Sequence, residues 1–261
     1  MNKTALVTGA SSGIGFAACE MLLKKGYTVY GLSRRGTGPE GIQGVTCDVT
    51  DEEAVNEAVK GIIEATGRLD LLVNNAGFGI SGPVEFTKSF DADKQMRVNF
   101  TGQFLMAKAV LPYMRKQQAG KIIFVSSVAG EMAIPYQAFY SASKAAVNSL
   151  ALALKNEVRD FGIKIAIVMP GDTRTSFTDL REKETLGDRV YTKNDSAVKA
   201  MEKDERNGMA PSEVAKVIMK AEKAANPRPF YIAGGKYRFF HVLVKFLPAK
   251  LVYFVIGKMY A

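Results

Sequence analysis

The chain has 261 residues, 47% of them hydrophobic and 23% charged, which is the composition of a globular protein with one large domain or two small ones. Two cysteines and a single histidine, His241, exclude a disulfide framework and argue against zinc chemistry, so we predict no metal site. The net charge is +9, but no nucleic-acid-binding motif accompanies it, and no nucleic-acid partner is predicted.

The first fifteen residues, MNKTALVTGASSGIG, contain too short an apolar run for a signal peptide. No stretch of the sequence approaches the ~20 apolar residues of a membrane-spanning helix. Together with the low cysteine content, these features predict a protein of the reducing cytoplasm.

Apolar runs rich in β-branched residues alternate with helical patterns over the first 170 residues. The predicted strands are 4–8, 28–32, 44–49, 69–75, 121–127 and 163–170, and the predicted helices lie near 13–25, 51–66, 91–117 and 136–160. The strands are continuously apolar, which is typical of a parallel sheet covered on both faces. We therefore predict an α/β fold with a single Rossmann-like, doubly wound parallel sheet and helices on both faces.

Two features refine this outline. The helix near 51–66 is expected to open with a capping box formed by Thr50 and Glu53. After Pro170 the chain becomes polar, with helices near 194–206 and 211–224 and a last strand within 229–235. These elements predict one domain over residues 1–235 and a separate tail over 236–261.

The first strand leads into the segment TGASSGIG, with glycines at positions 9, 13 and 15. Glycines permit a tight turn there, and the following helix offers unpaired N–H groups to a pyrophosphate. We predict a dinucleotide site, with a turn that binds no ligand as the alternative. GFGISG at 77–82 matches the same pattern, but Pro83 follows it and no helix opens, so it is interpreted as a glycine-rich loop.

The end of the second strand predicts which dinucleotide binds. NAD-binding folds usually place an acid about 20 residues after the glycines, yet TVYGLSRR at 28–35 contains none before Glu40. Ser33, Arg34 and Arg35 stand where a 2′-phosphate would lie, and guanidinium groups bind phosphate by paired hydrogen bonds. The sequence therefore favours NADP(H), the alternative being two solvated arginines.

A series of motifs then follows in order along the chain: TGASSGIG at 8–15, NNAG at 74–77, Asn99, Ser127, YSASK at 140–144 and PG at 170–171. Over residues 1 to about 175 this set resembles the short-chain dehydrogenase/reductase family, in which a serine also precedes the tyrosine by thirteen residues. The resemblance, most apparent to the hydroxysteroid dehydrogenases of the single-domain NADP-dependent branch, implies an NADP-binding catalytic domain over 1–235. It makes 172–209 the substrate loop.

The tyrosine and lysine of YSASK, Tyr140 and Lys144, lie one helical turn apart on the same face. Reduction of a ketone develops negative charge on its oxygen, so a proton donor must lie close to it. We expect the Lys144 ammonium to lower the pKa of the Tyr140 phenol from ~10 toward neutrality, which permits acid–base chemistry without histidine.

Two further residues complete the predicted catalytic set. Ser127 is expected to hydrogen-bond the substrate oxygen, with the adjacent Ser126 as the competing choice. The resemblance implies that Lys144 also holds the nicotinamide ribose and that Asn99 holds a water in a proton relay to it. A solvent-facing side chain is the alternative for Asn99.

The predicted cofactor-binding residues are Gly9, Ser11, Ser12, Gly13, Ile14, Gly15, Ser33, Arg34, Arg35, Asp48, Val49, Asn75, Ala76, Gly77, Tyr140, Lys144, Pro170, Gly171, Thr173 and Thr175. The resemblance implies that Asn75 and Gly77 lie against the adenosine and that Asp48 binds the adenine, a simple turn aspartate being its alternative. It also implies that Thr173 and Thr175 contact the carboxamide or the phosphates.

The substrate side is predicted from apolar residues. Phe177, Leu180, Leu186 and Val190 on one wall, and Met132, Ile134, Pro135, Tyr136 and Phe139 on the other, are expected either to cover an apolar substrate or to pack on the domain. Asp172 is charged where an apolar residue is commoner in the family. Basic and aromatic tails like 236–261 occur in relatives that act on steroids, retinoids or lipid ketones.

The tail carries Lys236, Arg238, Lys245, Lys250 and Lys258 and no acid, and Pro248 divides it. It fits a pair of interfacial helices, which could meet a membrane peripherally, the substrate loop or a second subunit. We predict an NADP(H)-dependent oxidoreductase that interconverts a ketone and a secondary alcohol, lipophilic or steroid-like. The alternatives are a β-ketoacyl thioester reductase and a non-catalytic NADP-sensing protein; the resemblance implies a homodimer or homotetramer.

Overall fold

The centre of the molecule is a seven-stranded parallel sheet. The computed structural model describes residues 2–260. The strands are β1 (Thr4–Thr8), β2 (Thr28–Ser33), β3 (Gln43–Thr46), β4 (Leu71–Asn74), β6 (Gly120–Val125), β7 (Ile163–Pro170) and β9 (Phe230–Ala233). Their spatial order is β3-β2-β1-β4-β6-β7-β9. The predicted doubly wound parallel sheet is thus confirmed.

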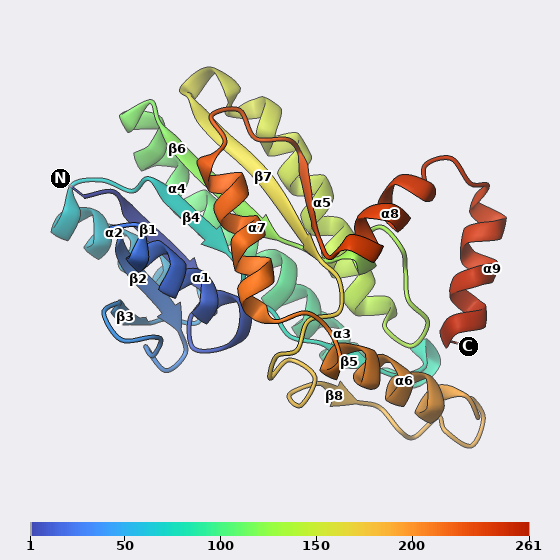
Figure 1. Cartoon of the computed structure of the whole chain (residues 1–261). Coiled ribbons are helices and arrows are strands. Elements are labelled where there is room, and N and C mark those ends of the chain that lie inside the picture. Colours follow the sequence, from blue (N-terminus) through green and yellow to red (C-terminus); the bar gives the residue numbers. More distant parts are fainter. Residues whose placement is uncertain (1, 261) are drawn as a thin grey trace.

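Helices cover both faces of the sheet (Figure 1). On one face lie α1 (Gly13–Lys24) and α7 (Pro211–Lys223), and on the other lie α2 (Glu52–Thr66), α4 (Gly102–Gln117) and α5 (Ala138–Glu157). Each face has its own core cluster, represented by Leu22 and Ile218 on the first and by Val59 and Met106 on the second. Because both faces are covered, the inner strands β1, β4 and β7 are almost entirely buried, whereas the edge strand β3 is largely exposed.

The start of α2 differs from the expected capping box. Asp51 is the N-cap residue, and its Oδ1 accepts hydrogen bonds from the N–H groups of Glu53 and Ala54, each at 3.0 Å. The hydroxyl of Thr50 instead donates to Asp48 at 2.8 Å. The prediction that Thr50 caps this helix was wrong because the hydrogen bond to Asp48 holds the Thr50 side chain outside the helix.

The region predicted as one long helix over 91–117 consists of three parts. α3 (Ser89–Met96) leads into a π-helical turn (Arg97–Thr101), and α4 follows. A π-helical turn inserts an extra residue and changes which side chains face inward, and such turns occur frequently at functional sites. Here it contains Asn99, which is fully buried, so the solvent-facing alternative is excluded.

A short second sheet was not predicted from the sequence. β5 (Ile80–Ser81) pairs in parallel with β8 (Glu182–Lys183) and joins the loop after β4 to the 172–209 segment. α6 (Asn194–Arg206) follows at the predicted position.

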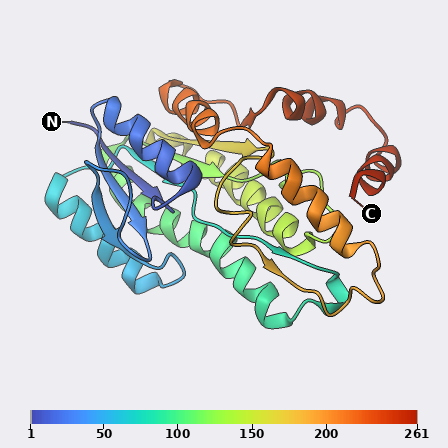
Figure 2. The same cartoon turned by 60° about the horizontal axis from the view of Figure 1, so that its bottom comes forward.

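The tail forms two helices, α8 (Gly235–Leu243) and α9 (Ala249–Tyr260), with Pro248 between them as predicted. They extend from the end of the sheet beyond β9, away from α1 and α2 (Figures 1 and 2). No helix within residues 2–260 combines the length and the apolar composition needed to cross a membrane.

Candidate active site

The strand order reverses between β1 and β4, and a crevice for ligands is expected at the carboxyl ends of strands at such a point. Gly9 and Gly13 have φ angles of 68° and 57°, which favour glycine. A Cβ atom at position 15 would lie 2.3 Å from the carbonyl oxygen of Gly9. The three predicted glycines therefore allow the backbone of this loop to turn tightly.

The remaining loop residues fit a phosphate group. Ser11 and Ser12 precede α1, while Ile14 lies in its first turn and packs on the core. Ser12 is the N-cap residue but makes no side-chain capping hydrogen bond. The first N–H groups of α1 are therefore free of a side-chain cap, as a pyrophosphate at a helix N-terminus requires.

Thr8, which was not predicted as a site residue, joins the two sides of the crevice. Its Oγ1 accepts hydrogen bonds from the N–H groups of Asn75 (2.8 Å) and Ala76 (2.9 Å). The Asn75 side chain in turn donates to the Thr8 carbonyl at 3.0 Å. A Cβ at position 77 would lie 3.0 Å from Asn99 Oδ1, so Gly77 allows the loop to approach the catalytic candidates.

The two predicted phosphate-binding arginines follow β2. Arg34 and Arg35 are exposed, and neither forms an ion pair with another residue of the 2–260 segment. The hydroxyl of Ser33 is engaged by Thr37, whose N–H donates to it at 3.1 Å. Ser33 thus closes the turn, and the two arginine side chains are exposed at this edge of the sheet.

Asp48 and Val49 lie beyond the end of β3. Asp48 Oδ1 accepts from the N–H of Thr50 at 2.9 Å and from its hydroxyl at 2.8 Å, as a turn aspartate does. Val49 is buried. The structure therefore supplies the turn role for Asp48, while its contact with adenine stays a prediction.

Asn99 holds the loop that follows β4. Its Oδ1 accepts from the N–H of Phe78 at 2.9 Å, and its Nδ2 donates to the Phe78 carbonyl at 3.0 Å and to Ser143 Oγ at 3.1 Å. The buried side chain of Gln95, which sequence reasoning missed, also donates to the Phe78 carbonyl, at 2.6 Å. Two buried amides therefore position this loop beside Lys144.

The two candidate serines have different partners. Ser126 donates to the backbone carbonyl of Lys144 at 3.0 Å, which anchors α5 to the end of β6. Ser127 hydrogen-bonds the side chain of Tyr140. The structure thus brings Ser127, as expected, to the candidate proton donor.

Lys144 is almost fully buried, with its Nζ 5.8 Å from the centroid of the Tyr140 ring. Its ammonium donates to the carbonyl of Val125 at 3.0 Å. Burial lowers the pKa of Lys144 to about 8, because the uncharged amine tolerates a desolvated position better.

The pKa of Tyr140 differs from the expectation that Lys144 lowers it toward neutrality. Burial raises the pKa of Tyr140 to about 12, and the hydrogen bond with Ser127 lowers it only in part. The charge of Glu205 raises this pKa further and that of Arg181 lowers it. Desolvation of the phenolate outweighs the Ser127 hydrogen bond and the Arg181 charge, so the Tyr140 phenol is protonated at neutral pH.

Among the apolar residues predicted to cover a substrate, Phe177 reaches the site. Its ring centroid lies 5.5 Å from that of Tyr140. Ile134 and Tyr136 pack against α6, and Met132 packs against the main core. The side chains of Leu180, Leu186 and Val190 are exposed.

The segment after β7 contacts both the phosphate loop and the tail. Thr175 lies 3.2 Å from the position of a Cβ on Gly13, consistent with its predicted place near the phosphates. The hydroxyl of Thr173 is directed elsewhere and donates to the carbonyl of Gly171 at 2.8 Å. Gly171 follows Pro170, the last residue of β7, and its missing side chain leaves room for the Tyr237 ring.

The unusual Asp172 fastens the tail to this segment. It accepts a hydrogen bond from the Tyr237 hydroxyl and pairs with Lys236 at 3.4 Å, both of α8. A second connection joins His241 Nδ1 to Glu131 Oε2 at 2.5 Å. α8 is therefore held against the loops that follow β6 and β7.

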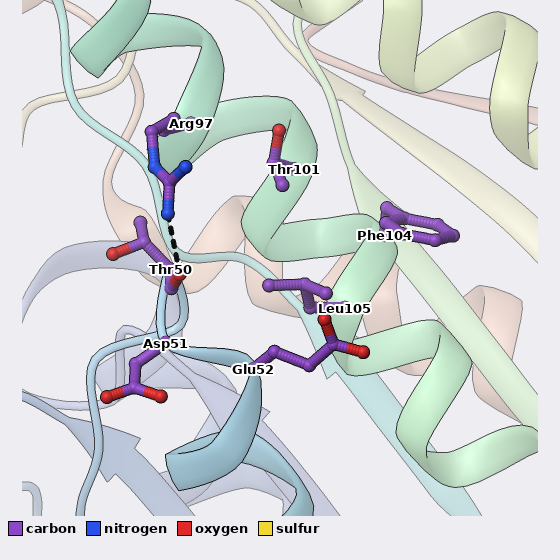
Figure 3. Close-up of a pocket in the computed structure, with 7 residues that line it drawn as sticks. All are labelled: Thr50, Asp51, Glu52, Arg97, Thr101, Phe104 and Leu105. Atoms are coloured by element: carbon purple, nitrogen blue, oxygen red, sulfur yellow. Dashed lines mark hydrogen bonds between the residues drawn. The ribbon is translucent and has the colours of Figure 1, made fainter.

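A separate surface hollow lies between the start of α2 and α4 (Figure 3). Arg97 reaches across it and donates to the carbonyl of Thr50 at 3.2 Å. The hollow is lined by Thr50, Asp51, Glu52, Arg97, Thr101, Phe104 and Leu105. None of these residues belongs to the predicted catalytic set.

The comparisons with known proteins show the family of the chain. The family model of the short chain dehydrogenases matches residues 3–185. The chain is 45% identical over 234 residues to a protein of Bacteroides thetaiotaomicron named 3-ketodihydrosphingosine reductase, a match covering 88% of this chain and 87% of that protein. This chain belongs to the short-chain dehydrogenase/reductase family.

Further relatives show the range of the family. The chain is 35% identical over 179 residues to the 3-oxoacyl-[acyl-carrier-protein] reductase MabA of Mycobacterium tuberculosis, which covers 68% of this chain and 72% of that protein. A short-chain dehydrogenase from Streptomyces avermitilis superposes with a TM-score of 0.82 and 30% identity, covering 94% and 92% of the two chains. ElxO with NADP bound superposes with a TM-score of 0.74 and 31% identity, covering 91% and 99%.

Proposed function

We propose that the protein is an NADP(H)-dependent reductase of lipophilic ketones, in particular of long aliphatic chains with the ketone at carbon 3. The observation that carries this proposal is the cluster of the buried Asn99, Ser127 and Lys144 with the partly buried Tyr140 at the carboxyl ends of the strands. The names of the two relatives, a 3-ketodihydrosphingosine reductase and a 3-oxoacyl reductase, favour a long-chain 3-ketone over the steroid-like substrate expected from the sequence.

Each residue of the cluster has a part in the reaction. The bound cofactor supplies the hydride to the ketone carbon. Tyr140 donates its phenolic proton to the ketone oxygen, and Ser127 donates a hydrogen bond to the same oxygen as charge develops there. Lys144 holds positive charge beside the phenol, and Asn99 keeps the loop at Phe78 in place.

The cofactor preference rests on the residues that follow β2. Arg34 and Arg35 are exposed and unpaired within residues 2–260, and no acid stands beside them to bind a ribose hydroxyl. The phosphate loop fits the pyrophosphate as described above. The chain therefore supplies both cationic and backbone donors for NADP(H).

The test is NADPH oxidation with four ketones: 3-ketodihydrosphingosine, a long-chain 3-oxoacyl thioester of acyl carrier protein, a 3-ketosteroid and a four-carbon ketone. We expect the greatest kcat/KM for 3-ketodihydrosphingosine. Preference for the thioester would assign the second candidate function, which the match to the mycobacterial reductase supports. Absence of oxidation with all four, while NADPH binds, would favour a non-catalytic NADP-sensing protein.

The pH dependence of ketone reduction follows from the two pKa values. Tyr140, with its pKa at about 12, stays protonated through neutral pH, so its titration does not change kcat/KM in that range. Lys144, with its pKa lowered to about 8, carries its positive charge below that pH and loses it above. We expect kcat/KM to be constant below about pH 7 and to decline as the pH rises through about 8; a profile that stays level to pH 10 would contradict the role of Lys144.

We also propose that the tail contacts a membrane surface peripherally. Large apolar side chains are exposed along α8, α9 and the turn between them, including Phe239, Val242, Phe246, Leu251, Phe254 and Val255. The same segment carries five cations and no acid, which suits anionic lipids. Contact of this face with a lipid surface would bring a lipophilic ketone close to the active site, because α8 is bound to the loops that follow β6 and β7.

Replacing both Phe239 and Phe246 by serine tests this contact. We expect the variant to bind vesicles with 30% phosphatidylserine roughly tenfold more weakly than the unchanged protein, because each buried phenyl ring contributes to insertion. The matched control is Phe90→Ser, which alters an exposed phenylalanine on α3 outside the tail. If vesicle binding is unchanged but a dimer or tetramer dissociates in sedimentation velocity, the tail covers a second subunit instead.

A further inference from the structure

A buried ion pair lies beside the catalytic tyrosine and has no place in the mechanism above. The side chain of Arg181, from the 172–209 segment, is 0% exposed and pairs with Glu205 of α6. The other carboxylate oxygen of Glu205 accepts a hydrogen bond from Thr178 Oγ1 at 2.7 Å. The carboxylate is therefore held on both sides, and it fixes the guanidinium in turn.

The guanidinium of Arg181 is only partly satisfied. Its Nη2 donates to Glu205, whereas Nε and Nη1 are buried and have no hydrogen-bond partner within residues 2–260. Buried donors of a charged group are nearly always paired in native proteins, and each exception calls for an explanation. Nε–H points to the Nη2 side of the guanidinium, whereas Nη1 lies on the Cδ side, so a ligand oxygen can accept from either of these unpaired donors but not from both.

The position of Arg181 links it to the reacting ketone. The guanidinium carbon lies 5.6 Å from the centroid of the Phe177 ring, and the same ring lies 5.5 Å from that of Tyr140. The Phe177 ring thus contacts both the phenol ring of Tyr140 and the guanidinium of Arg181. The charges of both partners also act on the pKa of Tyr140, which Glu205 raises and Arg181 lowers.

The charge of the pair indicates which acceptor is suitable. Glu205 neutralises Arg181, so an anionic ligand group would meet the carboxylate without gaining from a net positive charge. A neutral oxygen, in a hydroxyl or a carbonyl group, accepts from one of the unpaired donors without this repulsion. Phe177 contacts both Tyr140 and Arg181, so a second oxygen on the ketone-bearing chain is the acceptor that this arrangement suggests.

We propose that Arg181 is a substrate-binding residue in which one of the two unpaired donors, Nε or Nη1, donates a hydrogen bond to a neutral oxygen on carbon 1 of a chain whose ketone is on carbon 3. Tyr140 and Ser127 hold the ketone oxygen, and Phe177 packs against the carbons between the two oxygens. The carbon 1 oxygen is either a hydroxyl group or the carbonyl of a thioester. This inference rests on the proposed reduction of long-chain 3-ketones and names a specificity-determining group for it.

The test compares two ketones that differ in one atom: a long-chain 1-hydroxy-3-ketone and the same 3-ketone without the hydroxyl. We expect the unchanged protein to prefer the hydroxy ketone by about 30-fold in kcat/KM, since buried donors discriminate against a ligand that lacks their acceptor. A 3-oxoacyl pantetheine thioester serves as a third substrate and distinguishes the carbonyl from the hydroxyl source. No preference for either oxygenated ketone would overturn the inference and leave the ketone reductase proposal intact.

The double variant Arg181→Met with Glu205→Gln removes the donors without leaving a buried charge unpaired. We expect its preference for the oxygenated ketone to fall to within about threefold. The matched control is Arg206→Met, a change on the same helix as Glu205 that breaks an exposed pair with Asp179 and should retain the full preference. A double variant that keeps the 30-fold preference would show that Arg181 does not bind the oxygen.

A measurement on the unchanged protein covers the case in which the double variant fails to fold. In the presence of NADP⁺, calorimetry is expected to show that a long-chain 1,3-diol binds at least about tenfold more tightly than the matched 3-alcohol. Equal dissociation constants would overturn the inference. If the protein reduces neither ketone but binds NADPH, both this inference and the proposed function fail.

Discussion

Tyr140→Phe is expected to lower kcat for ketone reduction by roughly 10³-fold, because it removes the proton donor from an otherwise intact site. Tyr140 is the phenol that hydrogen-bonds Ser127, and Lys144 lies beside its ring. Phenylalanine keeps the ring and its packing on Phe177. The affinity for NADPH, measured by the change in nucleotide fluorescence, should stay within about threefold of the original value.

The control for this change is Tyr113→Phe, in which a tyrosine hydroxyl is removed from α4 outside the site. It should retain the original kcat. The mechanism is contradicted if Tyr140→Phe reduces the ketone at more than a tenth of the original rate. A variant that loses NADPH affinity as well would show that Tyr140 acts mainly in binding.

Replacing Arg34 and Arg35 together by alanine is expected to raise the KM for NADPH by roughly 100-fold and to change the KM for NADH by less than about threefold. The reason is that the guanidinium groups bind the 2′-phosphate, which NADH lacks. Both arginines are exposed and unpaired within residues 2–260, so their removal leaves the sheet unperturbed. The measurement is steady-state kinetics with each nucleotide at a saturating ketone concentration.

Lys116→Ala provides the matched control, since it removes an exposed cation from α4 away from β2. It should leave both KM values unchanged. If the double alanine variant raises the KM for NADPH and NADH equally, the arginines do not distinguish the 2′-phosphate, and the preference for NADP(H) must be abandoned.

The sheet could be predicted closely because its strands are continuous apolar runs. β1 occupies the predicted residues 4–8, and α6 occupies the predicted 194–206. The N-cap of α2 could not be decided in the same way, because Thr50 and Asp51 are adjacent and both suit a cap. The bond between Thr50 and Asp48 decides the choice, and it depends on the geometry of the turn.

The site was predictable to the extent that its residues lie in local motifs. The π-helical turn at Asn99 depends on hydrogen bonds to Phe78, which is 21 residues away, and the role of Asp172 depends on Tyr237, 65 residues away. Such pairs leave no periodic signal in the sequence. The buried Arg181 was missed for the same reason, because its partner Glu205 belongs to a different element.

The expected lowering of the Tyr140 pKa shows a further limit. The spacing of Tyr140 and Lys144 predicts that they are close, and their separation in the structure agrees. It does not predict how deeply the phenol is desolvated, and burial is the main influence on its pKa. The sequence therefore predicted the proximity of Tyr140 and Lys144 correctly. It predicted the direction of the Tyr140 pKa shift incorrectly.

The transfer of a deuterium atom tests the central claim most directly. NADPH carrying deuterium at the transferring C4 position of the nicotinamide is incubated with the protein and 3-ketodihydrosphingosine, and the product is analysed by mass spectrometry. We predict an alcohol with one deuterium on carbon 3, formed by the unchanged protein at least about 10³-fold faster than by Tyr140→Phe. An alcohol without deuterium, or no alcohol from any ketone of the panel, would contradict the proposal that this site reduces ketones with NADPH.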